Sequence, residues 1–194
     1  MPNHCNNYLV LGHKDAREIG RAKLAILDDN FFQEFHPCPQ DLLDTTAGYF
    51  SNEADQIALE AKTKSNLEKY GFANWYDWNC ANWGTKWDAY DIEIVSEHYE
   101  GDTAELSLTF DTAWAPPIAF YEKMEELGFS VLGMYNEFGC AFCGVYEDGY
   151  DEYVEYNSDT LDRIPTEVND QFGITDTLAE WEAYDEEEEM STEE

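Results

Sequence analysis

Apolar residues alternate with polar ones along some stretches of the chain and recur at helical spacing along others. Residues 8–11 form an apolar run that ends at Gly12, which predicts a buried strand. The alternation through 89–98 and 104–112, with a glycine-containing turn between them, predicts a hairpin of two half-buried strands. Two further strands are predicted at 129–135 and 141–146.

Helical spacing and helix-ending residues predict the helices. Asn52 or its neighbour Ser51 can cap a helix that runs to about Lys69 and ends at Gly71. Its inward-facing side chains would be Ile57, Ala61 and Leu67. Other helices are predicted at 15–27, 117–127 and 167–172. Thr177 and Glu180 match a capping box for a last helix.

The order of these elements is strand, helices, strand, strand, helix, strand, which is typical of a split βαβ fold. We therefore expect an α+β domain with a ferredoxin-like antiparallel sheet and helices packed on one face. The domain would cover residues 1–175, with a helical insertion after the first strand at about 15–82. Residues 176–194 would form a C-terminal helix and an acidic tail.

The charge of the chain restricts its partners. Of 194 residues, 43 are Asp or Glu and 10 are Lys or Arg, so the net charge is −33. Such a surface repels phosphate, which excludes nucleic acid and anionic membranes as main partners and favours basic proteins. There is no apolar run of membrane-spanning length and no secretory leader, and the five cysteines suit reduced thiols, so we expect a cytoplasmic protein.

Acidic residues concentrate in the second half of the chain. Residues 1–100 contain 17 acidic and 8 basic side chains, whereas 101–194 contain 26 acidic and 2 basic ones. In the stretch 147–155, tyrosines alternate with carboxylates, which indicates either a solvated face or a protein-binding patch. The candidate partner-binding residues are Glu147, Asp148, Tyr150, Asp151, Glu152, Tyr153, Glu155, Asp159 and Asp162.

Four of the six tryptophans lie within the stretch 75–87. Trp75 and Trp78 have the spacing of one helix face, and Gly84 would end that helix. The tryptophan-rich segment and Trp114 could line a stacking pocket, but large aromatic side chains are more often core residues. The residues concerned are Trp75, Trp78, Trp83, Gly84, Thr85, Lys86, Trp87 and Trp114. We expect Lys86 to hydrogen-bond Asp77, Asp88 or a carbonyl group.

Several motifs of the chain resemble those of the Api92-like family. They are residues 1–7, 37–42, 75–78, 82–88, 112–117 and 135–139, of which the tract 83–88 is the most specific. The resemblance implies a ferredoxin-like domain and an origin in phages, plasmids or other mobile elements, but no agreed activity. The chain departs from the family at His4, where tryptophan is usual, and in its stronger charge, which leaves its partner open.

Cysteine and histidine residues offer little further chemistry. Cys140 and Cys143 match half a zinc knuckle, and His4 with Cys5 might complete it. Residues three apart on a strand point to opposite faces, however, which favours reduced packing cysteines. We therefore expect no metal and no cofactor. Phosphate-binding loops and catalytic motifs are also missing from the sequence, so an enzyme is not expected.

These patterns favour one function and leave two others open. The first is an inhibitor that mimics nucleic acid and occupies the basic channel of a host DNA-handling protein, such as a restriction or CRISPR-type nuclease. The second is an interaction or assembly domain whose acidity serves solubility. The third is a small enzyme with a pocket near residues 83–88.

Overall fold

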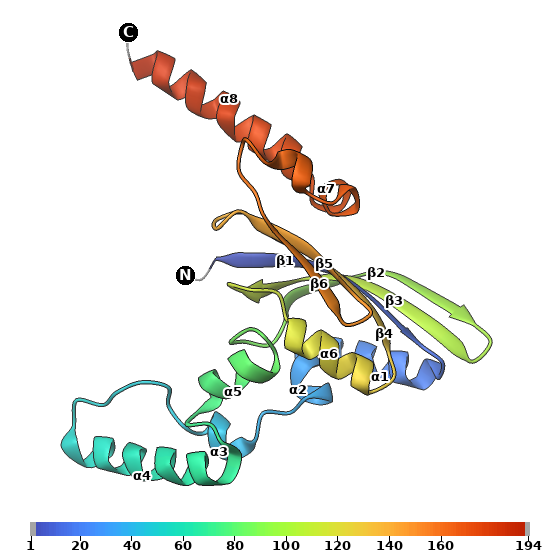
Figure 1. Cartoon of the computed structure of the whole chain (residues 1–194). Coiled ribbons are helices and arrows are strands. Elements are labelled where there is room, and N and C mark those ends of the chain that lie inside the picture. The colour runs from blue at the N-terminus through green and yellow to red at the C-terminus, as the bar shows by residue number, and fades with distance from the viewer. Residues whose placement is uncertain (1–2, 193–194) are drawn as a thin grey trace.

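A computed structural model describes residues 3–192 of the protein, with side chains as far as Tyr184. The fold is built on one antiparallel sheet (Figure 1). Its strands are β1 (His4–His13), β2 (Tyr90–Glu100), β3 (Thr103–Ala113), β4 (Ser130–Glu137), β5 (Phe142–Glu147) and β6 (Tyr150–Glu155). The order across the sheet is β2-β3-β1-β4-β5-β6. The edge strands are therefore β2 and β6.

The first four strands form a βαββαβ unit. Helix α1 (Ala16–Leu27) follows β1, and helix α6 (Ile118–Glu126) joins β3 to β4. Strand β3 lies between β1 and β2, as a split βαβ unit requires. The predicted α+β class with a ferredoxin-like antiparallel sheet is confirmed, and β5 and β6 widen the sheet beyond β4.

The main core lies between the sheet and the helices that follow β1 and β3. Leu9 and Leu11 of β1 and Leu108 of β3 point toward α1 and α6, because side chains on a strand alternate between its faces. The short helix α2 (Phe31–Phe35) adds Phe31 and Phe32, whose rings pack edge-on and tilted against their aromatic neighbours. This layer is the helix-covered face that the sequence predicts.

The insertion between β1 and β2 continues with three more helices, α3 (Gln40–Leu43), α4 (Glu53–Tyr70) and α5 (Trp75–Asn82). Figure 1 shows α4 lying well away from the sheet. The predicted ends of α4 are confirmed, since the Asn52 side chain accepts from Ala54 N and Gly71 has a left-handed φ of 79°.

The predicted inner face of α4 is wrong. Ile57 and Leu67 are 60% and 50% exposed, and Ala61 is exposed as well. The buried face carries Leu59 and Asn66, whose amide donates to Thr45 Oγ1 at 2.9 Å and to Ala73 O at 3.0 Å. Polar contacts therefore orient α4 together with the buried Leu59: besides Asn66, Lys62 donates to Asp44 O, and Lys69 and Tyr70 donate to Asp41.

The C-terminal segment packs on the opposite face of the sheet. After the 3₁₀ turn η1 (Leu161–Arg163), helix α7 (Thr166–Phe172) buries Val168 against Met134 of β4 and Cys143 of β5. Helix α8 (Ile174–Thr192) begins directly after Gly173. Thr177 therefore lies inside α8, and the predicted capping box is wrong. The acidic tail that we expected at the end of the chain lies partly within α8, which runs to Thr192, and partly outside the described residues.

None of the helices that the structure describes is both long enough and apolar enough to cross a bilayer.

Candidate functional site

The acidic stretch 147–155 forms a β-hairpin at the edge of the sheet. Asp148 and Gly149 connect β5 to β6, with φ angles of 49° and 75°. Two successive positive φ angles define the tight turn that matches the twist of a hairpin, and Asp-Gly is a preferred sequence for it. Strand β6 was not predicted from the sequence, although the Asp-Gly pair is a signal that indicates it.

The candidate residues of this hairpin divide between the two faces of the sheet. Asp151, Tyr153 and Glu155 pair with Tyr146, Gly144 and Phe142, which places them on the α6 side. Tyr150 and Glu152 lie on the opposite side, as does Glu147, because side chains alternate along a strand. Asp148 lies in the turn between the strands, and all but Asp151 are exposed. Asp159 and Asp162 are exposed too, but they lie beyond β6, in the loop before η1 and in η1 itself.

Tyrosine hydroxyl groups hold two carboxylates here, one on β6 and one on α6. The buried Tyr135 donates from Oη to Asp151 Oδ1 at 2.7 Å, and Tyr146 donates to Glu125 Oε2 at 2.7 Å. Tyr135 reaches Asp151 by crossing Gly144, where a Cβ atom would lie 2.3 Å from its hydroxyl oxygen. These hydrogen bonds fix carboxylate positions without adding positive charge.

Burial dominates the protonation of these groups. It raises the pKa of Asp151, although the Tyr135 hydroxyl lowers it in part. Burial also raises the pKa of Tyr135 and Tyr146, and the neighbouring carboxylates Asp151 and Glu125 raise it further. The tyrosines therefore stay neutral and remain donors at ordinary pH.

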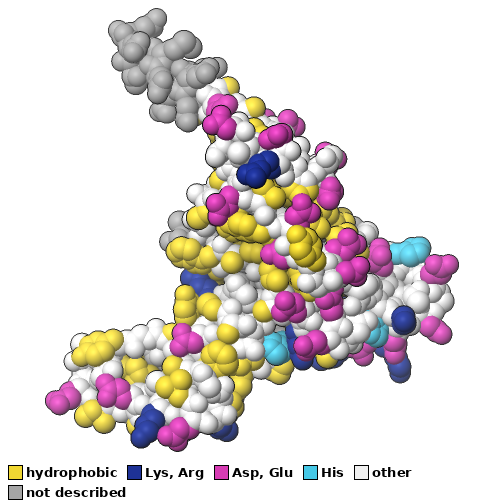
Figure 2. All heavy atoms as spheres, viewed as in Figure 1, with side chains coloured by type: hydrophobic (Ala, Val, Ile, Leu, Met, Phe, Trp, Pro, Cys, Tyr) yellow, Lys and Arg dark blue, Asp and Glu magenta, His cyan; other side chains and the backbone are white. Residues whose placement is uncertain are grey.

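The carboxylates of the hairpin lack basic neighbours. Among the described side chains, no Lys, Arg or His nitrogen lies within 4.0 Å of an acidic oxygen in residues 142–162. Figure 2 shows Asp and Glu side chains gathered over the middle of the face in view, whereas most Lys and Arg side chains in view lie lower. The hairpin therefore carries uncompensated negative charge.

The tryptophan-rich segment divides into a buried and an exposed part. Trp78 and Trp83 are core residues, and Trp83 Nε1 donates to His36 O at 2.8 Å. Trp75 is partly buried against the same core. Trp87 and Trp114, by contrast, are 42% and 56% exposed, so the core role predicted for most of the tryptophans does not extend to these two.

Gly84 causes this division. Its φ is 88°, and a Cβ atom there would lie 3.0 Å from Pro116 O and from Ile118 N. The chain therefore turns sharply against the start of α6, and the residues after the turn lead away from the core. The buried Thr85 fixes the turn by donating from Oγ1 to Ala113 O at 2.9 Å.

Lys86 and Asp88 do not pair with each other. The Asp88 carboxylate accepts from the backbone N–H groups of Phe32 and Gln33 at the start of α2, and burial raises its pKa. The Nζ atom of Lys86 lies 3.9 Å from the ring centroid of Trp87 and 5.5 Å from that of Trp114. Within the described residues it makes none of the hydrogen bonds that we predicted, because the ammonium group faces the two rings.

The cysteines are distributed as packing residues and surface thiols. Cys5 and Cys143 are buried, and burial raises the pKa of both thiols. Cys140 is exposed and accepts a long hydrogen bond from Asn3. Among the residues that the structure describes, no three His, Cys, Asp or Glu side chains come together as a metal site.

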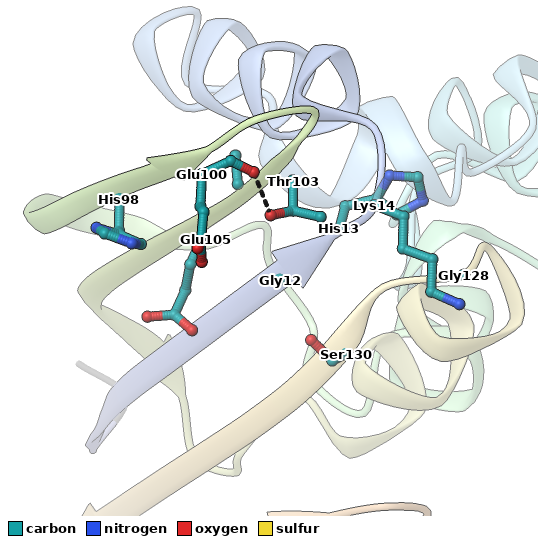
Figure 3. A pocket seen from close by; sticks show the side chains of 10 residues that line it. Gly12, His13, Lys14, His98, Glu100, Thr103, Glu105, Gly128 and Ser130 are labelled. Atoms are coloured by element: carbon teal, nitrogen blue, oxygen red, sulfur yellow. Dashed lines mark hydrogen bonds between the residues drawn. The ribbon is translucent and has the colours of Figure 1, made fainter.

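A shallow hollow of about 350 Å³, which the sequence did not predict, lies where β1 ends. Its lining includes His13, Lys14, His98, Glu105 and Ser130. Figure 3 shows these side chains spread over four segments, with Lys14 far from His98 and Glu105. The lining therefore brings no nucleophile next to a base, and we assign no chemistry to this hollow.

No family model matches the chain, and no curated protein matches it. In structure the chain is similar to the crystal structure of a protein api92 from Yersinia pseudotuberculosis. The identity is 11%, the alignment covers 81% of this chain and 99% of that one, and the TM-score is 0.39.

Proposed function

We propose that this protein is an inhibitor that binds a basic, nucleic-acid-handling protein by presenting the β5–β6 hairpin in place of nucleic acid. The observation that carries the proposal is that the carboxylates of the hairpin have no basic partner among the described side chains. A charged group without a counterion in its own fold is available to the opposite charge of a partner.

Each face of the hairpin presents separated negative charges, as a phosphate backbone does. Side chains alternate along β6, so neighbours on one face are about 7 Å apart, and on the α6 side Asp151 and Glu155 have Tyr153 between them. The Tyr135 hydroxyl holds Asp151 in place, which lowers the entropy that the side chain would lose on binding. The uncompensated field would also steer a basic partner toward this edge.

The partner class follows from the charge and from the motif resemblance. A protein whose groove binds a polyanion is the natural recipient of a surface of unpaired carboxylates. The Api92-like motifs imply an origin in a mobile element, for which a restriction or CRISPR-type nuclease of the host would be a useful target. We therefore propose such a nuclease as the partner.

The test compares two variants that change the net charge equally. The hairpin variant carries D148N, D151N, E152Q and E155Q, and the control carries E53Q, D55N, E60Q and E68Q on α4. Each protein is added to a panel of purified restriction endonucleases and RNA-guided nucleases, and DNA cleavage is measured at low and high salt.

We expect the unchanged protein and the control to inhibit at least one nuclease, with inhibition falling steeply as salt rises. The hairpin variant should lose this inhibition. Equal inhibition by both variants would assign the acidity a general role such as solubility, and failure to inhibit any nuclease would refute this partner class.

A further inference from the structure

We propose that the groove around Lys86, between Trp87 and Trp114, binds a small ligand in which a flat aromatic ring carries a single anionic group. The site is separate from the β5–β6 hairpin, and the proposal does not depend on the inhibitor function. Its basis is a cation without a carboxylate partner that lies between two exposed indole rings.

Two adjoining hollows form the groove. One, of about 280 Å³, is lined by Tyr76, Cys80, Lys86 and Trp114. The other, of about 470 Å³, is lined by Ala47, Asn74, Trp75, Tyr76, Asp77, Lys86 and Trp87. Lys86 and Tyr76 border both hollows, so a ligand in either one meets the ammonium group. Volumes of this size suit a small molecule with one or two rings.

Trp114 is presented to solvent at a conformational cost. Its φ is 78°, in the left-handed region that bulky side chains rarely adopt. The backbone N–H of Trp114 donates to Asn3 O at 3.0 Å and so holds this conformation. Because the exposed ring buries little apolar surface, it contributes little free energy of folding to offset this strain. A strained residue that does not stabilise the fold is typical of a binding site.

Lys86 supplies the charge that a ligand would meet. Within the described part of the chain, no carboxylate oxygen lies within 4.0 Å of its Nζ atom. An anionic group can therefore pair with it without displacing an internal partner. The net charge of −33 disfavours a polyanion strongly and a single anion much less, because salt screens distant charges.

The remaining polar groups of the groove favour an aromatic ligand over a sugar. Asn74 uses its Oδ1 to cap α5 and its Nδ2 to donate to Asp77. Thr85 donates its hydroxyl to Ala113 O. Amide, carboxylate and hydroxyl groups are the usual partners of sugar hydroxyls, and here the Asn74 amide, the Thr85 hydroxyl and one oxygen of Asp77 are engaged. The remaining surface consists of ring faces, the Lys86 ammonium group, the Tyr76 hydroxyl and, in the larger hollow, the exposed Asp77. The lining of the smaller hollow contains no carboxylate, so stacking plus one ion pair with Lys86 is best accommodated there, beside Trp114.

The test follows the indole N–H signals of the full chain by ¹H–¹⁵N NMR. The probes are adenosine 5′-monophosphate and indole-3-acetate, which share the proposed chemistry, together with adenosine, inorganic phosphate and maltose. The W87F and W114F variants assign the two signals, and Trp181, which is 50% exposed on α8, serves as the reference tryptophan. The two anionic aromatic probes distinguish a nucleotide from an aromatic acid as the natural ligand.

We expect at least one anionic aromatic probe to shift the Trp87 and Trp114 signals and to leave the Trp181 signal in place. Adenosine should bind about tenfold more weakly than its monophosphate, and K86M should weaken binding by about tenfold, because each change removes the charge-assisted contact. K64M is the matched control, on α4, and should have no effect. Equal binding of adenosine and its monophosphate, a response to maltose alone, or no shift with any probe would overturn the proposal.

Thiol alkylation provides a readout that does not depend on the tryptophan variants. Cys80 lines the smaller hollow, whereas Cys140 is exposed elsewhere, in the turn between β4 and β5. The bound probe should slow the reaction of Cys80 with iodoacetamide and leave the reaction of Cys140 unchanged. Equal rates with and without the probe that gave the NMR shift would contradict binding in this groove.

Discussion

The N-terminal helices and the β5–β6 hairpin hold their acidic residues in opposite ways. On the helical side, carboxylates pair with basic residues: Arg21 Nε lies 2.6 Å from Glu34, and Lys69 Nζ lies 2.7 Å from Asp41. In the hairpin, Asp151 accepts a hydrogen bond from the neutral Tyr135. The first arrangement cancels charge, and the second positions charge without cancelling it, which is what a surface for a basic partner requires.

The pKa values of the two regions differ accordingly. The Arg17 guanidinium beside Asp15 lowers the pKa of that carboxyl group to about 2, and Lys69 lowers the pKa of Asp41. Burial raises the pKa of Asp151. Ionisation therefore stabilises the fold at the first two sites and opposes it at the third.

The largest expected effect comes from adding one methyl group to each region. G144A places a Cβ atom 2.5 Å from Glu152 O and against the Tyr135 hydroxyl, so we expect the free energy of unfolding to fall by about 3 kcal/mol. G20A, in the interior of α1, meets no atom within 4 Å and should raise it by about 0.5–1 kcal/mol. Urea denaturation measures both, and a tolerated G144A would contradict the close packing across β5.

Removing one hydroxyl group weakens the hold on the hairpin carboxylate. Y135F deletes the donor to Asp151 and should lower the free energy of unfolding by about 1–2 kcal/mol at neutral pH. The pKa of Asp151 should rise further, because the lost hydrogen bond favoured its charged form. The loss should therefore shrink as the pH falls and Asp151 becomes protonated. Chemical denaturation and carboxyl ¹³C titration test this, and Y153F, at an exposed tyrosine of β6, is the control.

The pH dependence of stability should have opposite signs in the two regions. Asp15 has a folded pKa below its ordinary value of 3.8, so its contribution is present above that pH and is lost as the pH falls toward 2. Asp151 has a folded pKa above 3.8, so its contribution falls as the pH rises through the interval just above that value. D15N and D151N should each remove one of these slopes. Identical pH profiles of the two variants would mean that the regions do not differ.

The smallest expected effect is that of salt. Raising the NaCl concentration screens the repulsion among hairpin carboxylates and also weakens the exposed ion pairs of the helices. Amide hydrogen exchange should therefore slow in β6 and stay constant or quicken slightly at the start of α1, where Arg17 pairs with Asp15. A uniform change along the chain would show that the charge of the hairpin is not distinctive.

Local signals in the sequence predict many elements correctly. The ends of α4 follow from Asn52 and Gly71, because a capping side chain and a left-handed glycine act within a few residues. The hairpin of β2 and β3 follows from alternation and from the short turn between the two strands. These features depend on neighbours in the chain.

The candidate sites were predicted only in part. The acidic stretch was identified from its composition, but its folding into β6 was missed because charge was weighed above the Asp-Gly turn. Lys86 was recognised as a polar group of the tryptophan segment, but its position between Trp87 and Trp114 was not predicted. Trp114 comes from the end of β3, and no pattern within the sequence indicates that it meets Lys86.

Composition and local spacing were enough to establish the charge excess, the class of fold and most element boundaries, since each arises from residue type or from contacts a few positions apart. Which side of α4 is buried, which tryptophans reach solvent and which carboxylates lack a counterion depended on the packed fold. Those properties arise from contacts between segments far apart in the chain, such as Asn66 with Thr45, Thr85 with Ala113 and Tyr135 with Asp151.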